Sequence, residues 1–281
     1  MLLTLAPGLR VVRRGHDHVQ VGLYDDRVVV LPRSDATAHV LSRIHEGEPI
    51  DLDVPGVAAT VTRLVASGCA LPHTSAQSSA QPLAPSRSRR RAETRIEVVG
   101  HLGQPGPDPV PLLAAAGLSL LGRGPEVPAA SRGDVVLLIS RGEPDRERLD
   151  PWLRAEVPYL VVRLVDAGVV VGPFVLPGRS ACLRCTDAHV ADSDPDHLSV
   201  LTRYAEASRR RRGDGSDDVE PALVSLGLAW AVRDLVAHAD GRRPSTCSRT
   251  VRLGPEPDRE RHTSWSMHPE CACCWRGHAH R

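Results

Sequence analysis

The chain has 281 residues, of which 41% are hydrophobic, and its formal net charge is +1. A chain of this length can bury a core and can form two domains. Its start does not resemble a signal peptide, and no uninterrupted apolar run reaches the roughly 18 residues of a membrane span. We therefore expect a cytoplasmic protein without a membrane partner, in which paired cysteines stay reduced and hold metal. Lysine is absent, so no amine is available to bind phosphate or form a Schiff base.

Residues 1–73 form the first predicted unit, a small α+β module. Short apolar or alternating runs predict three strands, and two helical patterns follow them. The predicted strands are Leu9–Arg13, His18–Asp25 and Arg27–Pro32, with a tight turn at Asp25 and Asp26 between the last two. Ser34 is the predicted N-cap of a helix that ends at Gly47, and Gly68 closes a second helix that begins near Val57. This order is typical of a winged-helix-like module.

The same residues resemble the PqqD-like recognition elements that bind precursor peptides in ribosomal peptide natural product (RiPP) pathways. The resemblance lies in LRVVRRGHDHVQVGLYDDRVVVLP, in a helix that ends at a glycine, and in a helix that ends in ASGCAL. It implies three strands and three helices, with a leader peptide added as a fourth strand beside the third strand and packed on the last helix. The peptide-binding residues that it implies are Arg27, Val28, Val29, Val30 and Leu31 on the strand, and Val57, Thr60, Val61 and Leu64 on the helix.

Two other interpretations of this module stay open. For any one of these apolar side chains taken alone, burial in the core is favoured over peptide contact. A winged helix can also bind DNA, but the candidate recognition helix offers Arg63 and several apolar residues, which is a poor footprint for phosphates. We therefore predict no nucleic-acid partner.

Residues 74–94 are predicted to be a flexible linker. The segment is rich in Ser, Ala, Pro and Gln, shows no apolar periodicity, and ends in a basic run that includes Arg87 and Arg91. A solvated linker is favoured over a contact with an acidic partner.

Residues 95–281 show the pattern of a Rossmann-like α/β domain. Continuous aliphatic runs predict buried strands, and helical segments lie between them. The predicted strands are Ile96–Val99, Asp134–Ser140, Tyr159–Val165 and Val169–Val175, with late antiparallel additions at Ser248–Leu253 and Ser264–Met267. The predicted helices are Val110–Ala116, Asp145–Glu156 and Val219–Ala237.

The turn after the first of these strands is a poor nucleotide site. A phosphate-binding turn needs glycines and free backbone N–H groups at a helix N-terminus. Gly100, Gly103 and Gly106 supply the glycines, but four prolines crowd the place where the helix should begin, and each removes an N–H group. They are Pro105, Pro107, Pro109 and Pro111. We therefore predict that ATP does not bind here.

Two CxxC pairs predict a structural Zn²⁺ site. Cys182 and Cys185 form one pair, and Cys271 and Cys274 form the other. Two such pairs can bring four thiolates to the corners of one tetrahedron, and a site closed by four sulfurs contributes folding energy. Cys273 could replace Cys274 in the second pair, and His268 is a further alternative ligand. Of the other cysteines, we predict that Cys69 is a small core residue and that Cys247 is inert.

This second segment resembles the ThiF-like, ubiquitin-activating-enzyme-like fold, in its branch found in azoline-forming (TOMM, thiopeptide-type) peptide clusters. The resemblance is carried by GPFVLPGRSACLRC at 172–185 and by the downstream HPxCxxC at 268–274. It implies a partner protein that recruits a precursor peptide while a YcaO-type enzyme uses ATP to cyclise Cys, Ser or Thr. The chain departs from active adenylating members in its proline-rich turn, in the absence of lysine, and in having no evident catalytic cysteine.

The polar run from Asp187 to His197 could indicate a second metal, but helix capping or solvent exposure is the favoured interpretation. The run Arg209–Arg212 is predicted to lie in a mobile loop. The leading hypothesis is a two-domain protein without catalytic residues that binds a leader peptide and presents it to a YcaO-type cyclodehydratase. An adenylating enzyme that acts itself on a peptide or carrier protein is the alternative, a DNA-binding regulator is a third interpretation, and a homodimer is left open.

Overall fold

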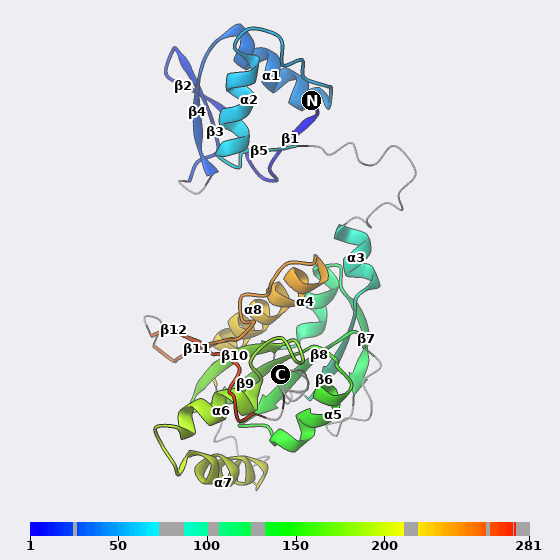
Figure 1. Cartoon of the computed structure of the whole chain (residues 1–281), viewed down its shortest axis with the longest axis vertical. Coiled ribbons are helices and arrows are strands. Elements are labelled where there is room, and N and C mark those ends of the chain that lie inside the picture. The colour runs from blue at the N-terminus through cyan, green and yellow to red at the C-terminus, as the bar shows by residue number, and fades with distance from the viewer. Residues whose placement is uncertain are drawn as a thin grey trace. The chain divides into compact units, whose positions relative to one another are not determined.

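The computed structural model describes residues 1–24, 27–72, 87–100, 107–124, 133–210, 219–256, 259–271 and 273. The chain divides into two compact units, Met1–Ala84 and Pro85–Arg281 (Figure 1). Each unit has its own buried apolar core, and the larger unit has one core on either face of its sheet.

The N-terminal unit contains two small sheets. β2 (Val11–Arg14), β3 (His18–Val21) and β4 (Val29–Pro32) form an antiparallel sheet in that order, which confirms the three predicted strands with shorter bounds. β1 (Leu3–Leu5) pairs with β5 (Ala70–Pro72) and was not predicted. These two strands are only three residues long, too short for a period of two to mark them.

The connection between β3 and β4 differs from the predicted tight turn. β3 ends at Val21, and the connection spans residues 22–28. Gly22 has φ +84°, and a Cβ atom there would lie 1.9 Å from the carbonyl oxygen of Arg27, so the chain reverses at Gly22 and approaches its own backbone closely. Asp25 and Asp26 lie outside the described residues.

Two helices cover the core of this unit, where the resemblance implied three. α1 (Asp35–Glu46) begins as predicted at Ser34, whose hydroxyl accepts a hydrogen bond from the Thr37 N–H at 3.2 Å, and it ends at Gly47 in the left-handed conformation. α2 (Val57–Ala66) follows, and Gly68 just beyond it also has positive φ. A third helix is not among the described residues of this unit.

The larger unit is built on a seven-stranded sheet with the order β12-β11-β10-β9-β8-β6-β7. The parallel part, in chain order, is β6 (Arg95–Val99), β7 (Ser119–Gly124), β8 (Val135–Arg141) and β9 (Tyr159–Val165). The antiparallel part is β10 (Gly168–Val175), β11 (Arg249–Leu253) and β12 (Arg261–Ser264). The predicted buried strands are confirmed. β7 was missed because glycines interrupt it, and the last strand lies before the predicted Ser264–Met267.

Helices pack on both faces of this sheet (Figure 1). α4 (Pro109–Ala115) and α8 (Pro221–Ala239) contribute Leu113 and Leu228 to the core on one face. The short 3-10 helix η2 (Arg146–Leu149), α5 (Asp150–Arg154) and α6 (Leu183–Ala191) cover the other face, and α7 (His197–Arg210) packs on α6. Alternate residues of β8 enter the two cores, as expected for a strand buried on both sides.

Two helices of this unit, α3 and α8, have sequences that suggest other structures. α3 (Arg87–Glu93) lies where an irregular linker was predicted. The helix packs on α8, and Arg91 donates two hydrogen bonds of 2.8 Å to the carboxylate of Asp240. α8 is long and apolar enough to pass for a membrane span, but it packs against β9 and β10. It also buries Asp234, which accepts hydrogen bonds from Ser245 and Thr246.

Candidate metal centre and a free strand edge

The first cysteine pair sits at the N-terminus of α6. Cys182 is the N-cap residue of this helix, and Cys185 lies in its first turn. The loop before it is held by Ser180, whose hydroxyl accepts a 2.7 Å hydrogen bond from the Leu176 N–H, and by Ser248, whose hydroxyl accepts from the Ala181 N–H. Both thiols therefore project from a fixed turn at the positive end of a helix, an environment that favours thiolates.

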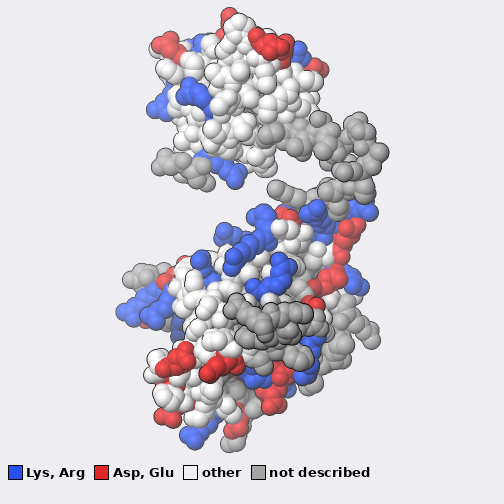
Figure 2. Space-filling model, in the orientation of Figure 1, with Lys and Arg blue, Asp and Glu red and all other residues white. Residues whose placement is uncertain are grey.

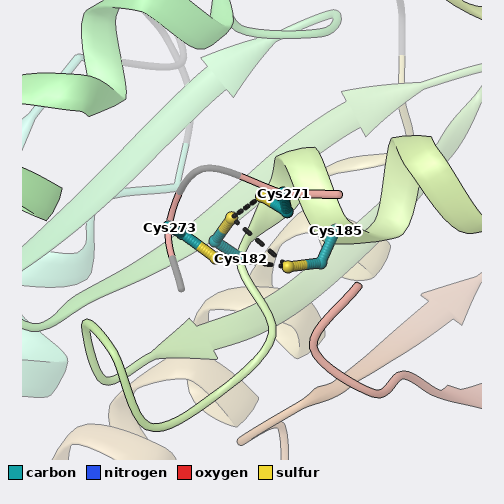
Figure 3. Close-up of side chains that lie close together, drawn as sticks. All are labelled: Cys182, Cys185, Cys271 and Cys273. Atoms are coloured by element: carbon teal, nitrogen blue, oxygen red, sulfur yellow. Dashed lines mark hydrogen bonds between the residues drawn. The ribbon is translucent and has the colours of Figure 1, made fainter. Parts of the chain in front are cut away.

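Four sulfur atoms converge from the start of α6 and from the C-terminal segment of this unit. The Sγ atoms of Cys182, Cys185, Cys271 and Cys273 all lie within 4.8 Å of one another and point toward a common centre (Figure 3). The Sγ–Sγ distances are 3.8 Å for Cys182–Cys185, 3.7 Å for Cys182–Cys271 and 3.4 Å for Cys185–Cys273. With Zn–S bonds of about 2.3 Å, a regular tetrahedron has edges of about 3.8 Å. The spacing fits a tetrahedral metal and is far too long for disulfide bonds.

The pKa values of the four thiols also indicate a site for a cation. Hydrogen bonding with the three other thiols, Cys182 first, lowers the pKa of Cys185. The hydrogen bond to Cys182 similarly lowers the pKa of Cys271 to about 7. The pKa values of Cys182 and Cys273 are instead raised, because hydrogen bonding to Cys185 and to Cys182, respectively, favours their protonated forms. Four neighbouring thiols cannot all ionise together without positive charge, and a divalent ion would supply it.

Three of the four predicted ligands belong to this cluster, and the fourth member is Cys273. The predicted ligand Cys274 lies outside the described residues. His268 is not a member, because its ring is used elsewhere. Its Nδ1 accepts from the Glu270 N–H at 3.2 Å, and its Nε2 lies 3.3 Å from the Asp192 carboxylate. The backbone of His268 does support the site, since its carbonyl accepts the Cys271 N–H at 3.0 Å.

His268 also forms a second group of candidate ligands with His189 and Asp192. The rings of His189 and His268 meet edge to face, with centroids 4.8 Å apart. Nε2 of His189 already lies 3.0 Å from both the carbonyl and the hydroxyl oxygen of Ser266. These contacts join the segment that carries Cys271 to α6, so the group supports the cysteine cluster.

A buried charge network lies beside the carboxyl end of β8. Arg146 makes hydrogen bonds of 2.8 and 3.0 Å to Asp187 and an ion pair of 2.8 Å with Glu143, which also pairs with Arg163 at 2.7 Å. Burial alone would raise the pKa of Glu143, but Arg163 and Arg146 outweigh it and hold that pKa below its usual value. Asp187 was expected at a helix cap or in solvent. Its partner lies 41 residues away in the sequence, so no local pattern could reveal the pair.

α4 starts just after the glycine-containing turn that was predicted to be a poor nucleotide site. The helix does begin there, with Asp108 as its N-cap and Pro109 at its first position. The Asp108 carboxylate accepts the Val110 N–H at 3.0 Å, while Pro109 and Pro111 have no N–H to offer. This helix end therefore presents a carboxylate in place of free donors. Residues 101–106 of the predicted turn lie outside the described residues, and Gly100 before them has φ +82°.

In the N-terminal unit, β4 is the outer strand of its sheet, with β3 on one side. The Arg33 N–H donates to the Asp17 carbonyl at 2.7 Å, so Arg33, Leu31 and Val29 direct their backbone groups toward β3. Val30 alternates with them and directs its N–H and carbonyl to the outer edge, where no other strand of the described residues pairs with β4. Arg63 on α2 donates to this Val30 carbonyl at 2.5 Å, which confirms its outward direction and places α2 beside the edge.

The predicted peptide-binding side chains divide into two groups. Five are buried in the core of the unit: Val29, Leu31, Val57, Val61 and Leu64. Thr60 is also buried, and its hydroxyl donates to the Gly56 carbonyl at 3.0 Å. Val28 and Val30 are half-buried and Arg27 is exposed. The exposed residues of α2 are Ala58, Ala59, Thr62, Arg63 and Ala66, and none of them was among the predicted peptide-binding residues.

The α/β unit with its CxxC-bearing helix and the N-terminal module together define a fold that solved structures share. No protein-family model and no curated protein matches the sequence. E. coli MccB, in a structure with AMPCPP and SeMet MccA, is similar with a TM-score of 0.64 at 10% identity, over 98% of this chain and 99% of MccB.

Two heterocyclase structures are similar as well. The heterocyclase TruD matches with a TM-score of 0.62 at 19% identity, over 97% of this chain and 42% of TruD. A heterocyclase in complex with substrate and cofactor matches with a TM-score of 0.62 at 16% identity, over 97% of this chain and 39% of that protein. This chain thus spans about two fifths of the length of these heterocyclases, and it has the fold of the matching part.

Proposed function

We propose that this chain binds the leader region of a ribosomally synthesised precursor peptide and presents it to a separate YcaO-type, ATP-dependent cyclodehydratase that forms azoline rings. The observation that carries the proposal is the free edge of β4 beside α2. Val30 directs its backbone groups outward there, and a peptide strand can pair with such an edge while a helix flanks it. The fold shared with heterocyclases and with MccB supports a role in peptide maturation.

Two features support a role without ATP chemistry of its own. At the start of α4, Asp108 holds the Val110 N–H, and the neighbouring prolines offer none, so a phosphate would meet a carboxylate. Arg146 and Arg163 are already engaged with Glu143 and other internal partners. The site closed by four cysteines would hold Zn²⁺ as a structural element, since it leaves no open position for a substrate.

The alternative function is an adenylating enzyme, and the likeness to MccB favours it because that protein is described with AMPCPP. Exchange of labelled pyrophosphate into ATP by the purified chain, with and without precursor peptide, separates the two functions. We expect no exchange above background. Sustained exchange that depends on the peptide would establish the alternative.

Peptide binding is tested with the leader peptide encoded beside the gene, labelled with a fluorophore, by fluorescence polarisation. Val30→Pro removes the outward N–H of β4 without removing a hydrogen bond to β3, because an edge strand tolerates proline at an outward position. Loss of this contact should weaken binding about tenfold. The matched control is Val11→Pro on β2. There Gly22 donates to the Arg10 carbonyl, so Val11 faces outward at the opposite edge.

Both variants should keep the circular dichroism spectrum of the parent chain. Equal affinity of the Val30→Pro variant and the parent would contradict docking at β4, and no leader binding by the parent chain would reject the function as a whole. In a separate assay with purified YcaO-type cyclodehydratase, ATP and precursor peptide, the precursor should be modified faster with this chain than without it.

A further inference from the structure

We propose that this docking edge selects peptides with an acidic side chain opposite Arg63 and with apolar side chains two residues before and after it. The inference rests on the proposed function and names the class of peptide sequence that the site prefers. It follows from the direction of the Arg63 side chain, from its spare hydrogen-bond donors, and from the small residues on either side of it.

Arg63 is the only charged residue of α2, whose sequence is VAATVTRLVA. Its side chain lies across the gap between helix and strand, since Nη2 donates to the Val30 carbonyl at 2.5 Å. In the chain without peptide this contact covers an outward carbonyl of the strand edge, as charged side chains on edge strands often do. A docking strand would pair with Val30 and would therefore meet the guanidinium directly.

A guanidinium has five N–H donors in a planar fork, and the described contact uses one of them. Among the residues that the structure describes, no carboxylate forms an ion pair with Arg63. Its remaining donors fit a carboxylate oxygen pair. A strand that docks here can supply that carboxylate from a side chain pointing toward α2, whereas a basic side chain at this position would be repelled.

Ala59 and Ala66 are exposed and lie on the same stripe of α2 as Arg63, four residues before it and three after it, while the exposed Ala58 and Thr62 lie to one side. A helix rises about 1.5 Å per residue, so these alanines lie about 6 Å and about 4.5 Å along the axis on either side of Arg63. Side chains on one face of a strand repeat about every 6.8 Å. The residues two positions before and after the acidic residue would therefore lie near the alanines, whose small side chains leave space for larger apolar ones.

The visible face of the N-terminal unit, over which α2 runs, is uncharged over most of its area (Figure 2). This surface suits apolar contacts. A docked peptide would remove water from Arg63 on α2, and the guanidinium would then discriminate between peptides that supply a carboxylate and peptides that do not. The expected recognition pattern is an apolar residue, any residue, Asp or Glu, any residue, and an apolar residue.

The experiment displays a random library of 12-residue peptides to the full chain and sequences the peptides that are retained. The parent chain should enrich the pattern above. Arg63→Glu should enrich Lys or Arg at the central position with the apolar positions unchanged. The matched control is Arg13→Glu on β2, which is also an exposed arginine but lies at the other edge of the sheet. It should enrich the same peptides as the parent.

One enriched peptide is then synthesised with Glu or Gln at the central position. The parent should bind the Gln form about tenfold more weakly, and Arg63→Gln should bind both forms equally. Enrichment of apolar residues without a central acid, or the same acid preference in the Arg63→Glu variant, would overturn the inference and leave the docking function standing. If the parent chain retains no peptide, the proposed function fails together with it.

Discussion

Replacement of Cys273 by serine tests the metal centre most directly, because this residue distinguishes the observed cluster from the spacing-based prediction. Its Sγ lies 3.4 Å from that of Cys185, inside a group whose distances fit a four-sulfur tetrahedron. The binding free energy of structural Zn²⁺ in zinc-finger peptides is about 10–16 kcal/mol. If the four ligands contribute equally, the loss of one costs about 3 kcal/mol of that binding free energy. We expect Cys273→Ser to bind Zn²⁺ about a hundredfold more weakly.

The assay is competition with a chromophoric chelator on the full chain, together with the visible spectrum of the Co²⁺ form, which reports the number of thiolate ligands. Cys274→Ser is the matched control and should keep the metal content and the spectrum of the parent chain. Removal of metal by a chelator should unfold the larger unit at lower temperature and leave the N-terminal unit intact. If Cys274→Ser lost a thiolate signal and Cys273→Ser did not, the described cluster would be wrong and the predicted CxxC pair right.

Two further predictions concern buried carboxylates. Asp187→Asn leaves Arg146 without its bidentate partner and should destabilise the larger unit by about 3 kcal/mol, which lowers its melting temperature by about 6–12 °C. As a control, Asp194→Asn at an exposed position should change the free energy of unfolding by less than about 0.5 kcal/mol. Equal effects of the two substitutions would contradict the network. Asp240→Asn should cost about 2 kcal/mol in urea unfolding at neutral pH. The hydrogen bond from Arg91 lowers the pKa of Asp240 to about 2, so this stabilisation is complete above roughly pH 4 and is lost as the pH falls toward 2. The stability difference between parent and variant should shrink over that range, and a difference independent of pH would contradict the ion pair.

The N-terminal module shows where sequence patterns fail at the level of single side chains. The strand at residues 29–32 and the helix from Val57 were predicted from periodicity and are present. Periodicity identifies the buried face of a helix, however, and residues chosen for their apolar character, such as Val61 and Leu64, are those that enter the core. The face that remains for a ligand is the one the hydrophobic pattern leaves out, and there the notable residue is Arg63.

The second unit shows a similar division. Continuous aliphatic runs such as 159–165 predicted the buried strands, because only a strand covered on both faces needs them. The short spacing at Cys182 and Cys185 predicted a metal-binding pair, and the structure places that pair at the start of α6. The choice among Cys271, Cys273 and Cys274 could not be made from spacing alone, since it depends on how the segment after Ser266 packs against α6.

The sequence alone therefore indicated most of the strands and helices and the pair formed by Cys182 and Cys185, because these depend on local spacing and on the period of apolar residues. The tertiary structure decided which cysteine completes the cluster, which carboxylates neutralise the buried arginines, and which face of α2 stands beside the open edge of β4. These contacts join residues that are tens of positions apart, such as Arg63 with Val30 and Cys182 with Cys271. No local pattern encodes such pairs, since they form only when the packing of the cores brings distant segments together.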